Sequence, residues 1–192
     1  MKTIIIGGTF NPIHNGHLYV SEELKLQLGY ERVLFIPSNY QVHKSRAELI
    51  SRDDRIKMIN MALENNTSTI DLCEINRGGF SYMVDTVKDI SSKFSISGKI
   101  GLFIGDDLIL GMKDWHNIDE LLELVDIVVA HRDSEGEYNT SIPHKYLNNV
   151  SIPISSSDIR HRISSGRAFR YLVPEKVYNY ILKKDLYKKD VS

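Results

Sequence analysis

The sequence is poor in cysteine, with one in 192 residues, Cys73. A disulfide within the chain is therefore excluded. Because Cys73 lies in the apolar stretch TIDLCEI, we interpret it as a buried, inert thiol, which fits a reducing compartment. Long apolar runs are also missing: none approaches the roughly 18 residues that a membrane-spanning helix needs. The first run, Thr3 to Ile6, has no basic leader, so we expect no signal peptide, no membrane partner and a cytoplasmic location.

An excess of either charge is absent as well, because 24 Lys and Arg residues face 25 Asp and Glu residues. This balance argues against nucleic acid as a partner. The apolar content of 42% and the charged content of 26% are those of an ordinary soluble protein. The length favours one domain over residues 1–192, with a late helical part at about 155–187.

Strand-like and helix-like stretches alternate at least five times. A β-branched run, TIII, is typical of a strand buried on both faces. Further strands are expected at RVLFIP (32–37), TIDLCEI (69–75), KIGLFIG (99–105), DIVVAH (126–131) and VSIPI (150–154), the last after a polar connection at 132–149. The alternation predicts an α/β fold, a Rossmann-like doubly wound parallel sheet with helices on both faces.

Helical periodicity fills the stretches between these strands. The inner stripes expected are Val20, Leu24 and Leu28; Ile56, Ile59 and Leu63; Met83, Val87, Ile90 and Phe94; and Val177, Ile181 and Leu182. Capping pairs are expected at Ser51 with Asp54 and at Asn117 with Glu120, and Pro174 is expected as the first residue of the last helix.

Polar and glycine-rich loops follow the predicted strands. Four of them are 7–17, 38–44, 74–85 and 105–116, and a fifth, 155–160, opens a late helix. Ligands bind parallel sheets at the carboxyl ends of their strands, so we expect these loops to form one site. In the first loop, glycines let backbone N–H groups approach an anion, and His14 and His17 are three residues apart at the start of a helix.

Other chemistries fit less well. GGTFNP is not the G-x-G-x-x-G of dehydrogenases, and GFSYM is not the G-x-S-x-G of serine hydrolases. A metal site made of His14, His17, His43 and His116 lacks a strong ligand spacing. What remains is phosphate chemistry without a covalent intermediate, in which the protein positions two anions and neutralises charge.

Two elements resemble the signature of the nucleotidylyltransferases. GGTFNPIHNGH contains H-x-G-H at 14–17, and ISSSDIR at 154–160 is similar to the late ISSxxIR element. HK at 43–44, EINRGGFSYMVDT at 74–86 and IGDDLILGMKDWHNIDELL at 104–122 narrow the resemblance to nicotinate-nucleotide adenylyltransferase. It extends from Thr3 to about Tyr187. Three departures are Asn11 for the usual Asp, YQV before His43, and Met83 where threonine is common.

The resemblance implies adenylyl transfer from ATP to nicotinate mononucleotide, giving deamido-NAD and pyrophosphate by direct in-line attack. It implies Mg²⁺ bound through the ATP phosphates and no metal site made by the protein. The catalytic residues would be His14, His17, Lys44 and Arg160. ATP would be bound by Gly7, Gly8, Thr9, Phe10, His17, Gly105, Asp106, Ser156, Ser157 and Arg160. The pyridine mononucleotide would be bound by Thr9, His43, Lys44, Met83, Thr86, Trp115 and His116.

Alternatives remain at this stage. The acceptor could be nicotinamide mononucleotide or pantetheine phosphate, or the chain could be a non-catalytic ATP-binding module. Asp106 also suits a helix cap, and a single tryptophan such as Trp115 also suits an ordinary core position. The sequence leaves the oligomeric state open.

Overall fold

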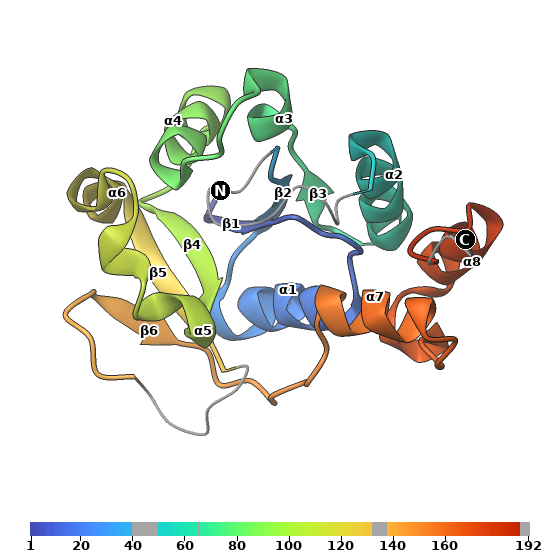
Figure 1. Ribbon diagram of the computed structural model, residues 1–192. Helices are drawn as coiled ribbons and strands as arrows, with labels where there is room; N and C mark the ends of the chain where they lie inside the picture. Colours follow the sequence, from blue (N-terminus) through green and yellow to red (C-terminus); the bar gives the residue numbers. More distant parts are fainter. Residues whose placement is uncertain (40–49, 65, 132–137, 189–192) are drawn as a thin grey trace.

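The computed structural model describes residues 1–39, 50–64, 66–131 and 138–188. Its centre is a six-stranded sheet in the order β3-β2-β1-β4-β5-β6, and every neighbouring pair is parallel (Figure 1). The strands are β1 Thr3–Gly8, β2 Arg32–Pro37, β3 Thr69–Ile70, β4 Ile100–Gly105, β5 Val125–Ala130 and β6 His144–Tyr146. The strand order reverses between β1 and β4, which confirms the doubly wound prediction.

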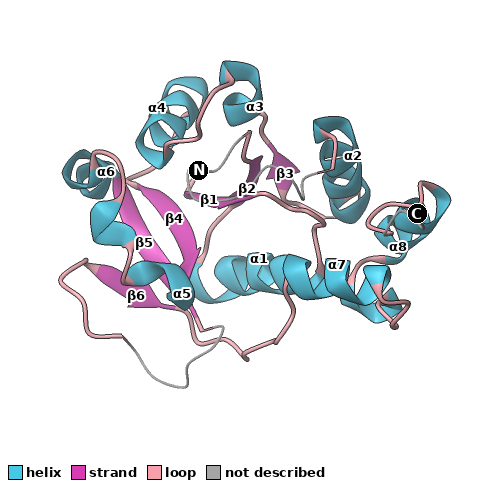
Figure 2. Ribbon diagram, in the orientation of Figure 1, coloured by secondary structure: helices cyan, strands magenta, loops and turns pink. Residues whose placement is uncertain are grey.

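Helices cover both faces of this sheet (Figure 2). They are α1 Asn15–Leu28, α2 Arg52–Leu63, α3 Cys73–Arg77, α4 Met83–Lys93, α5 Asp106–Ile109, α6 Ile118–Leu124, α7 Ser156–Ser164 and α8 Glu175–Lys183, with short 3-10 turns η2 Met112–Asp114 and η3 Arg170–Leu172. Within the described ranges, no helix has both the length and the apolar composition needed to cross a membrane.

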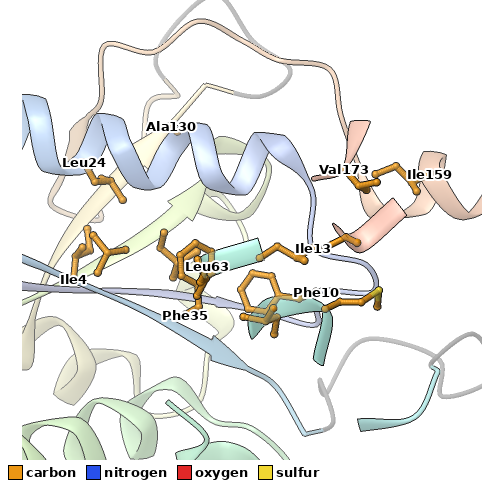
Figure 3. Close-up of a cluster of buried hydrophobic side chains, with 14 of the residues drawn as sticks. Ile4, Phe10, Ile13, Leu24, Phe35, Leu63, Ala130, Ile159 and Val173 are labelled. Atoms are coloured by element: carbon orange, nitrogen blue, oxygen red, sulfur yellow. The ribbon is translucent and has the colours of Figure 1, made fainter. Parts of the chain in front are cut away.

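The two faces hold separate apolar cores because side chains alternate along β1. Ile4 and Ile6 pack under α1, α2, α7 and α8, whereas Ile5 packs under α4, α5 and α6. All three are at most 2% exposed, as the β-branched run predicts. Figure 3 shows that the first core extends beyond β1, since Phe10 and Ile13 lie in the same cluster as Leu24.

Two predicted strands differ from the structure: the first is shorter than predicted, and the second is absent. In TIDLCEI only Thr69–Ile70 pairs with β2, and α3 then begins at Cys73. The cause is local: Asp71 Oδ1 accepts the Cys73 N–H at 2.9 Å, which turns the chain out of the sheet. Cys73 is thus half-buried in a helix, where burial and the neighbouring Asp71 raise the pKa of its thiol to about 12.

The second error concerns VSIPI, which forms no strand. The edge strand is β6, inside the stretch expected as a polar connection, and it pairs only with β5. Pro153 has no N–H for a ladder, which disfavours VSIPI. The three residues of β6 are polar and at least partly exposed, so a hydrophobic pattern does not reveal them.

Helix ends agree only in part with the expected caps. Ser51 Oγ accepts the Asp54 N–H at 3.0 Å, which confirms that cap. Asn117 makes no side-chain cap and has a left-handed backbone with φ 50°. Pro174 is the N-cap of α8 rather than its first residue. Leu182 is 43% exposed because the buried stripe of α8 passes through Val177 and Ile181.

Candidate active site

The two histidines lie where β1 passes into α1. His14 is the N-cap of α1, its backbone N–H donates to His17 Nδ1 at 3.2 Å, and the two rings stack with centroids 3.6 Å apart. Because Nδ1 of His17 accepts this hydrogen bond, the neutral ring carries its proton on Nε2. The Phe10 ring meets His17 edge-on at 5.1 Å. The backbone therefore sets the tautomer that makes Nε2 of His17 a donor.

The two glycines ahead of the histidines lie close to neighbouring side chains. A Cβ on Gly7 would lie 2.9 Å from the Met83 methyl group, and one on Gly8 would lie 3.2 Å from the Phe10 ring. Phe10 itself has φ 48°, a left-handed backbone that is strained for an aromatic residue. The loop thus turns sharply and its backbone lies close to the neighbouring elements.

A buried arginine holds this loop to the end of β2. Arg55 of α2 is 1% exposed, and its Nη1 donates to the carbonyl oxygens of Thr9 at 2.8 Å and Ser38 at 2.9 Å. Arg55 was not among the site residues predicted from the sequence. The signal was there, because Arg55 precedes Ile59 and Leu63 by four and eight residues and so shares their buried stripe.

The late helix α7 docks on the same loop. Ser155 caps the helix by accepting the Asp158 N–H at 3.0 Å. The Ser156 hydroxyl donates to the Pro12 carbonyl at 2.8 Å, and Arg160 Nη1 donates to the Asn11 carbonyl at 3.0 Å. A second nitrogen of Arg160, Nη2, contacts Ser157 Oγ at 3.3 Å. The structure therefore brings the ISSSDIR element against the histidine loop.

Asp106 lies at the carboxyl end of β4, next to β1 in the sheet. It is 1% exposed and is the first residue of α5, while Gly105 is the N-cap, so the helix-cap interpretation of Asp106 is wrong. Its Oδ2 lies 3.9 Å from Nδ1 of His131, whose ring stacks on Tyr146. His131 was not predicted, although it directly follows β5 and so satisfies the same strand-end rule.

The starts of α4 and α6 lie close together on one face of the sheet. Met83 is the first residue of α4, and Trp115 and His116 precede α6. The rings of Tyr82 and His116 have centroids 4.3 Å apart, which links the two segments. Trp115 is half-buried against the second core. The first N–H groups of a helix have no partner within it, so the start of α4 offers backbone donors.

Thr86 is a buried residue of α4. It has no exposed surface, its hydroxyl donates to Glu74 Oε1 at 2.7 Å, and it accepts from Arg77 Nη2 at 3.1 Å. Burial raises the pKa of Glu74 above its ordinary value, while hydrogen bonds from Ser81 and Thr86 act in the opposite direction. The structure thus ties the Thr86 hydroxyl into a buried network beneath the start of α4.

His43 and Lys44 lie outside the described residues, so their roles stay predictions. The described part of their loop ends at Asn39, whose N–H donates to Ser81 Oγ at 3.1 Å and whose Nδ2 donates to the Gly79 carbonyl at 2.8 Å. In the part of the chain that the structure describes, no group of three or more His, Cys, Asp or Glu residues is arranged to hold a metal ion.

A doubly wound sheet with a histidine pair at its first strand end and a docked late helix defines a class of nucleotide-binding α/β transferases. The cytidylyltransferase-like family model matches residues 5–162. The chain is 41% identical to a "probable nicotinate-nucleotide adenylyltransferase" of Borrelia garinii, over 100% of this chain and 98% of that protein. It is 34% identical to the protein of the same description from Treponema pallidum, over 98% and 100%. The chain belongs to the nicotinate-nucleotide adenylyltransferase family.

Solved structures agree on the fold. Plasmodium falciparum nicotinic acid mononucleotide adenylyltransferase, complexed with NaAD, superposes with a TM-score of 0.74 at 19% identity, over 97% of this chain and 98% of that one. The same protein complexed with APC superposes with a TM-score of 0.75. At this identity the likeness concerns the fold, and it includes the Rossmann-like topology inferred from the sequence.

Proposed function

We propose that this chain transfers the adenylyl group of ATP to nicotinate mononucleotide, releasing pyrophosphate and forming deamido-NAD. The observation that carries the proposal is the histidine loop. In this loop the His14 N–H occupies Nδ1 of His17, so that Nε2 carries the proton and can donate it. The Asn11 carbonyl of the same loop accepts a hydrogen bond from Arg160 of α7. The descriptions of relatives at 34–41% identity over almost the whole chain support the same activity.

The chemistry is a single in-line displacement. An oxygen of the mononucleotide phosphate bonds to the α-phosphorus of ATP, and the bond from that phosphorus to the bridging oxygen of pyrophosphate breaks, with its electron pair leaving on pyrophosphate. His14 and His17 stabilise the phosphates through donors, together with backbone N–H groups of Gly8, Thr9 and Phe10. Arg160 and Lys44 neutralise the charge that builds up on the leaving group, and Ser156 and Ser157 at the start of α7 contact the triphosphate.

Mg²⁺ belongs to the substrate in this proposal. In this proposal His17 and Arg160 offer the phosphates hydrogen-bond donors, the Nε2–H of the imidazole and the N–H groups of the guanidinium. Such donors do not ligate a cation. Mg²⁺ prefers phosphate oxygens and retained waters, so it enters as MgATP. Its contribution is to neutralise triphosphate charge.

The remaining residues divide between the two substrates. Gly7, Gly105 and Asp106 line the ATP side, where the Asp106 carboxylate accepts from the ribose hydroxyls. Trp115 stacks on the pyridine ring, and the backbone N–H groups of Met83 and His116 bind the nicotinate carboxylate. Thr9, His43 and Lys44 contact the mononucleotide. Thr86 supports the start of α4 through Glu74.

A cytoplasmic location is part of the same proposal. The lone cysteine supports it, because a single cysteine forms no disulfide within the chain. The balanced charge of 24 basic and 25 acidic residues supports small-molecule substrates and no nucleic-acid partner.

Pyrophosphate release from MgATP tests the proposal, with nicotinate mononucleotide, nicotinamide mononucleotide and pantetheine phosphate as separate acceptors. We expect the highest kcat/KM with the nicotinate form. Tight ATP binding without pyrophosphate release for any acceptor would make the chain a binding module. A preference for another acceptor would overturn the substrate assignment and leave adenylyl transfer intact.

A further inference from the structure

We propose that Tyr187, after the last helix, is a positioning residue that holds Arg160 in its catalytic orientation through Asn11. The inference rests on the proposed function, in which Arg160 neutralises charge on the ATP phosphates. The segment that follows α8 then contributes a residue, Tyr187, to the site.

Tyr187 and Arg160 both donate hydrogen bonds to one buried residue, Asn11. Asn11 is 1% exposed; its side-chain Oδ1 accepts the Tyr187 hydroxyl at 2.9 Å and its backbone carbonyl accepts Arg160 Nη1 at 3.0 Å. The partners are 176 and 149 residues away in the sequence. Asn11 is thus clamped from two separate segments, and it is three residues before His14.

The surroundings of Tyr187 suit a permanent donor. Burial raises the pKa of its phenol above the ordinary value, so the hydroxyl keeps its proton. The positive charges of Arg160 and Arg55 lower this pKa and the negative charge of Asp54 raises it, but burial has the largest effect. Arg55 in turn holds the Thr9 carbonyl, so the loop is fastened on both sides of Phe10.

The backbone of Tyr187 also indicates a constrained position. Its φ is 65°, in the left-handed region that a bulky residue rarely adopts. The ring packs against the first apolar core, and the Leu186 N–H donates to the Ile181 carbonyl at 3.1 Å. Such strain persists only where the surrounding structure compensates it.

The mechanism is geometric. The guanidinium of Arg160 bonds to the Asn11 carbonyl and to Ser157 Oγ. Without the Tyr187 hydroxyl, the Asn11 side chain loses that hydrogen bond, and the loop residue whose carbonyl accepts from Arg160 loses one of its anchors. A shift of about 1 Å in a group that stabilises a transition state costs up to about a hundredfold in rate.

Tyr187→Phe tests this, because it removes only the hydroxyl. We expect kcat per folded molecule to fall by about ten- to a hundredfold, with KM for nicotinate mononucleotide unchanged. Tyr180→Phe is the matched control, because the Tyr180 hydroxyl donates to Asp54 of α2 at 2.7 Å and not to Asn11. If both variants lose similar melting temperature and keep wild-type kcat, Tyr187 is merely structural and the proposal is overturned.

A double-mutant cycle separates positioning from general damage. In an Arg160→Ala background, Tyr187→Phe should lower kcat no further, and independent, multiplicative losses would contradict the proposal. Asn11→Ala removes the Oδ1 that accepts from Tyr187 and keeps the backbone carbonyl that accepts from Arg160, so it should match Tyr187→Phe. It therefore serves as the second variant if the phenylalanine variant folds poorly. If wild-type chain releases no pyrophosphate, the proposed function fails. If wild type is active and Tyr187→Phe equals it, only this inference fails.

Discussion

The site has two halves that are built in different ways. The histidine half is the loop at 7–17 with helix α7, and the pyridine half is formed by the starts of α4 and α6. On the histidine half, side chains from distant segments bond to backbone carbonyls of one loop: Arg55 to Thr9 across 46 residues, Arg160 to Asn11 across 149. On the pyridine half the buried Thr86 hydroxyl is bonded locally, to Glu74 across 12 residues and to Arg77 across nine, while Asn39 reaches Ser81 across 42. The loop of the first half depends on anchors up to 149 residues away, whereas the Thr86 network of the second half is made within one stretch of sequence.

The difference also concerns which groups act. On the histidine half we assign the chemistry to side chains, chiefly the imidazole of His17 and the guanidinium of Arg160. On the pyridine half we assign recognition of the nicotinate carboxylate to backbone N–H groups at Met83 and His116. Side-chain substitutions should therefore abolish turnover on one half, while on the other they should spare the backbone donors.

The largest expected effect is that of His17→Ala. Removing one preorganised donor to the phosphates should lower turnover by roughly a hundredfold to ten-thousandfold with little change in melting temperature. A steady-state pyrophosphate assay measures it, and His161→Ala, an exposed histidine on α7, is the control. Near-wild-type turnover of His17→Ala would contradict the assignment of His17 as a donor to the phosphates.

The next effect concerns the acceptor. A nicotinamide amide turned toward two backbone N–H groups leaves donors facing donors, and each unmade buried hydrogen bond costs about 1–3 kcal/mol. We therefore expect on the order of a hundredfold higher kcat/KM for the nicotinate form. Trp115→Ala should lower kcat/KM for both the nicotinate and the nicotinamide form and leave the ratio of the two values unchanged. A ratio that collapses in this variant would mean that the indole itself selects the acid.

Arg55→Met should act on stability. The substitution leaves the Thr9 and Ser38 carbonyls without their buried donor, at about 1–3 kcal/mol each in the free energy of unfolding. Urea denaturation measures the loss, and Arg52→Met, exposed on the same helix, is the control. Equal stability of the two variants would show that this loop does not depend on its distant anchor.

The smallest effect is a pH dependence on the pyridine half. The pKa of Glu74 is raised in the folded chain, so between its ordinary value of 4.5 and the raised value the folded state binds more protons than the unfolded state. The free energy of unfolding therefore falls as the pH rises through this window. Glu74→Gln should remove that slope, and Glu123→Gln, an exposed control, should keep it. An unchanged slope in Glu74→Gln would rule Glu74 out as its source.

Prediction from sequence succeeded where the physical cause is local or repeated. The β-branched run at Ile4 to Ile6 is buried on both faces, and Ser51 caps its helix, because both follow from neighbouring residues. The two errors in strand prediction have different causes: a local side-chain hydrogen bond that competes with the sheet, and an edge strand that is only partly buried. An aspartate turn at Asp71 ends one apolar stretch early, and the edge strand β6 needs almost no apolar pattern.

The sequence by itself determined the class of fold, the strand-end loops and the family, because periodicity and short motifs are properties of adjacent residues. Tertiary structure alone decided that Arg55, Arg160 and Tyr187 converge on residues 9–11, and that the Thr86 hydroxyl is turned into a buried network. The physical reason is that buried carbonyls must find donors, and which donor reaches them depends on how helices pack over a finished sheet. Spacing along the chain places Arg55 on a buried stripe, but it does not show which carbonyls the guanidinium reaches.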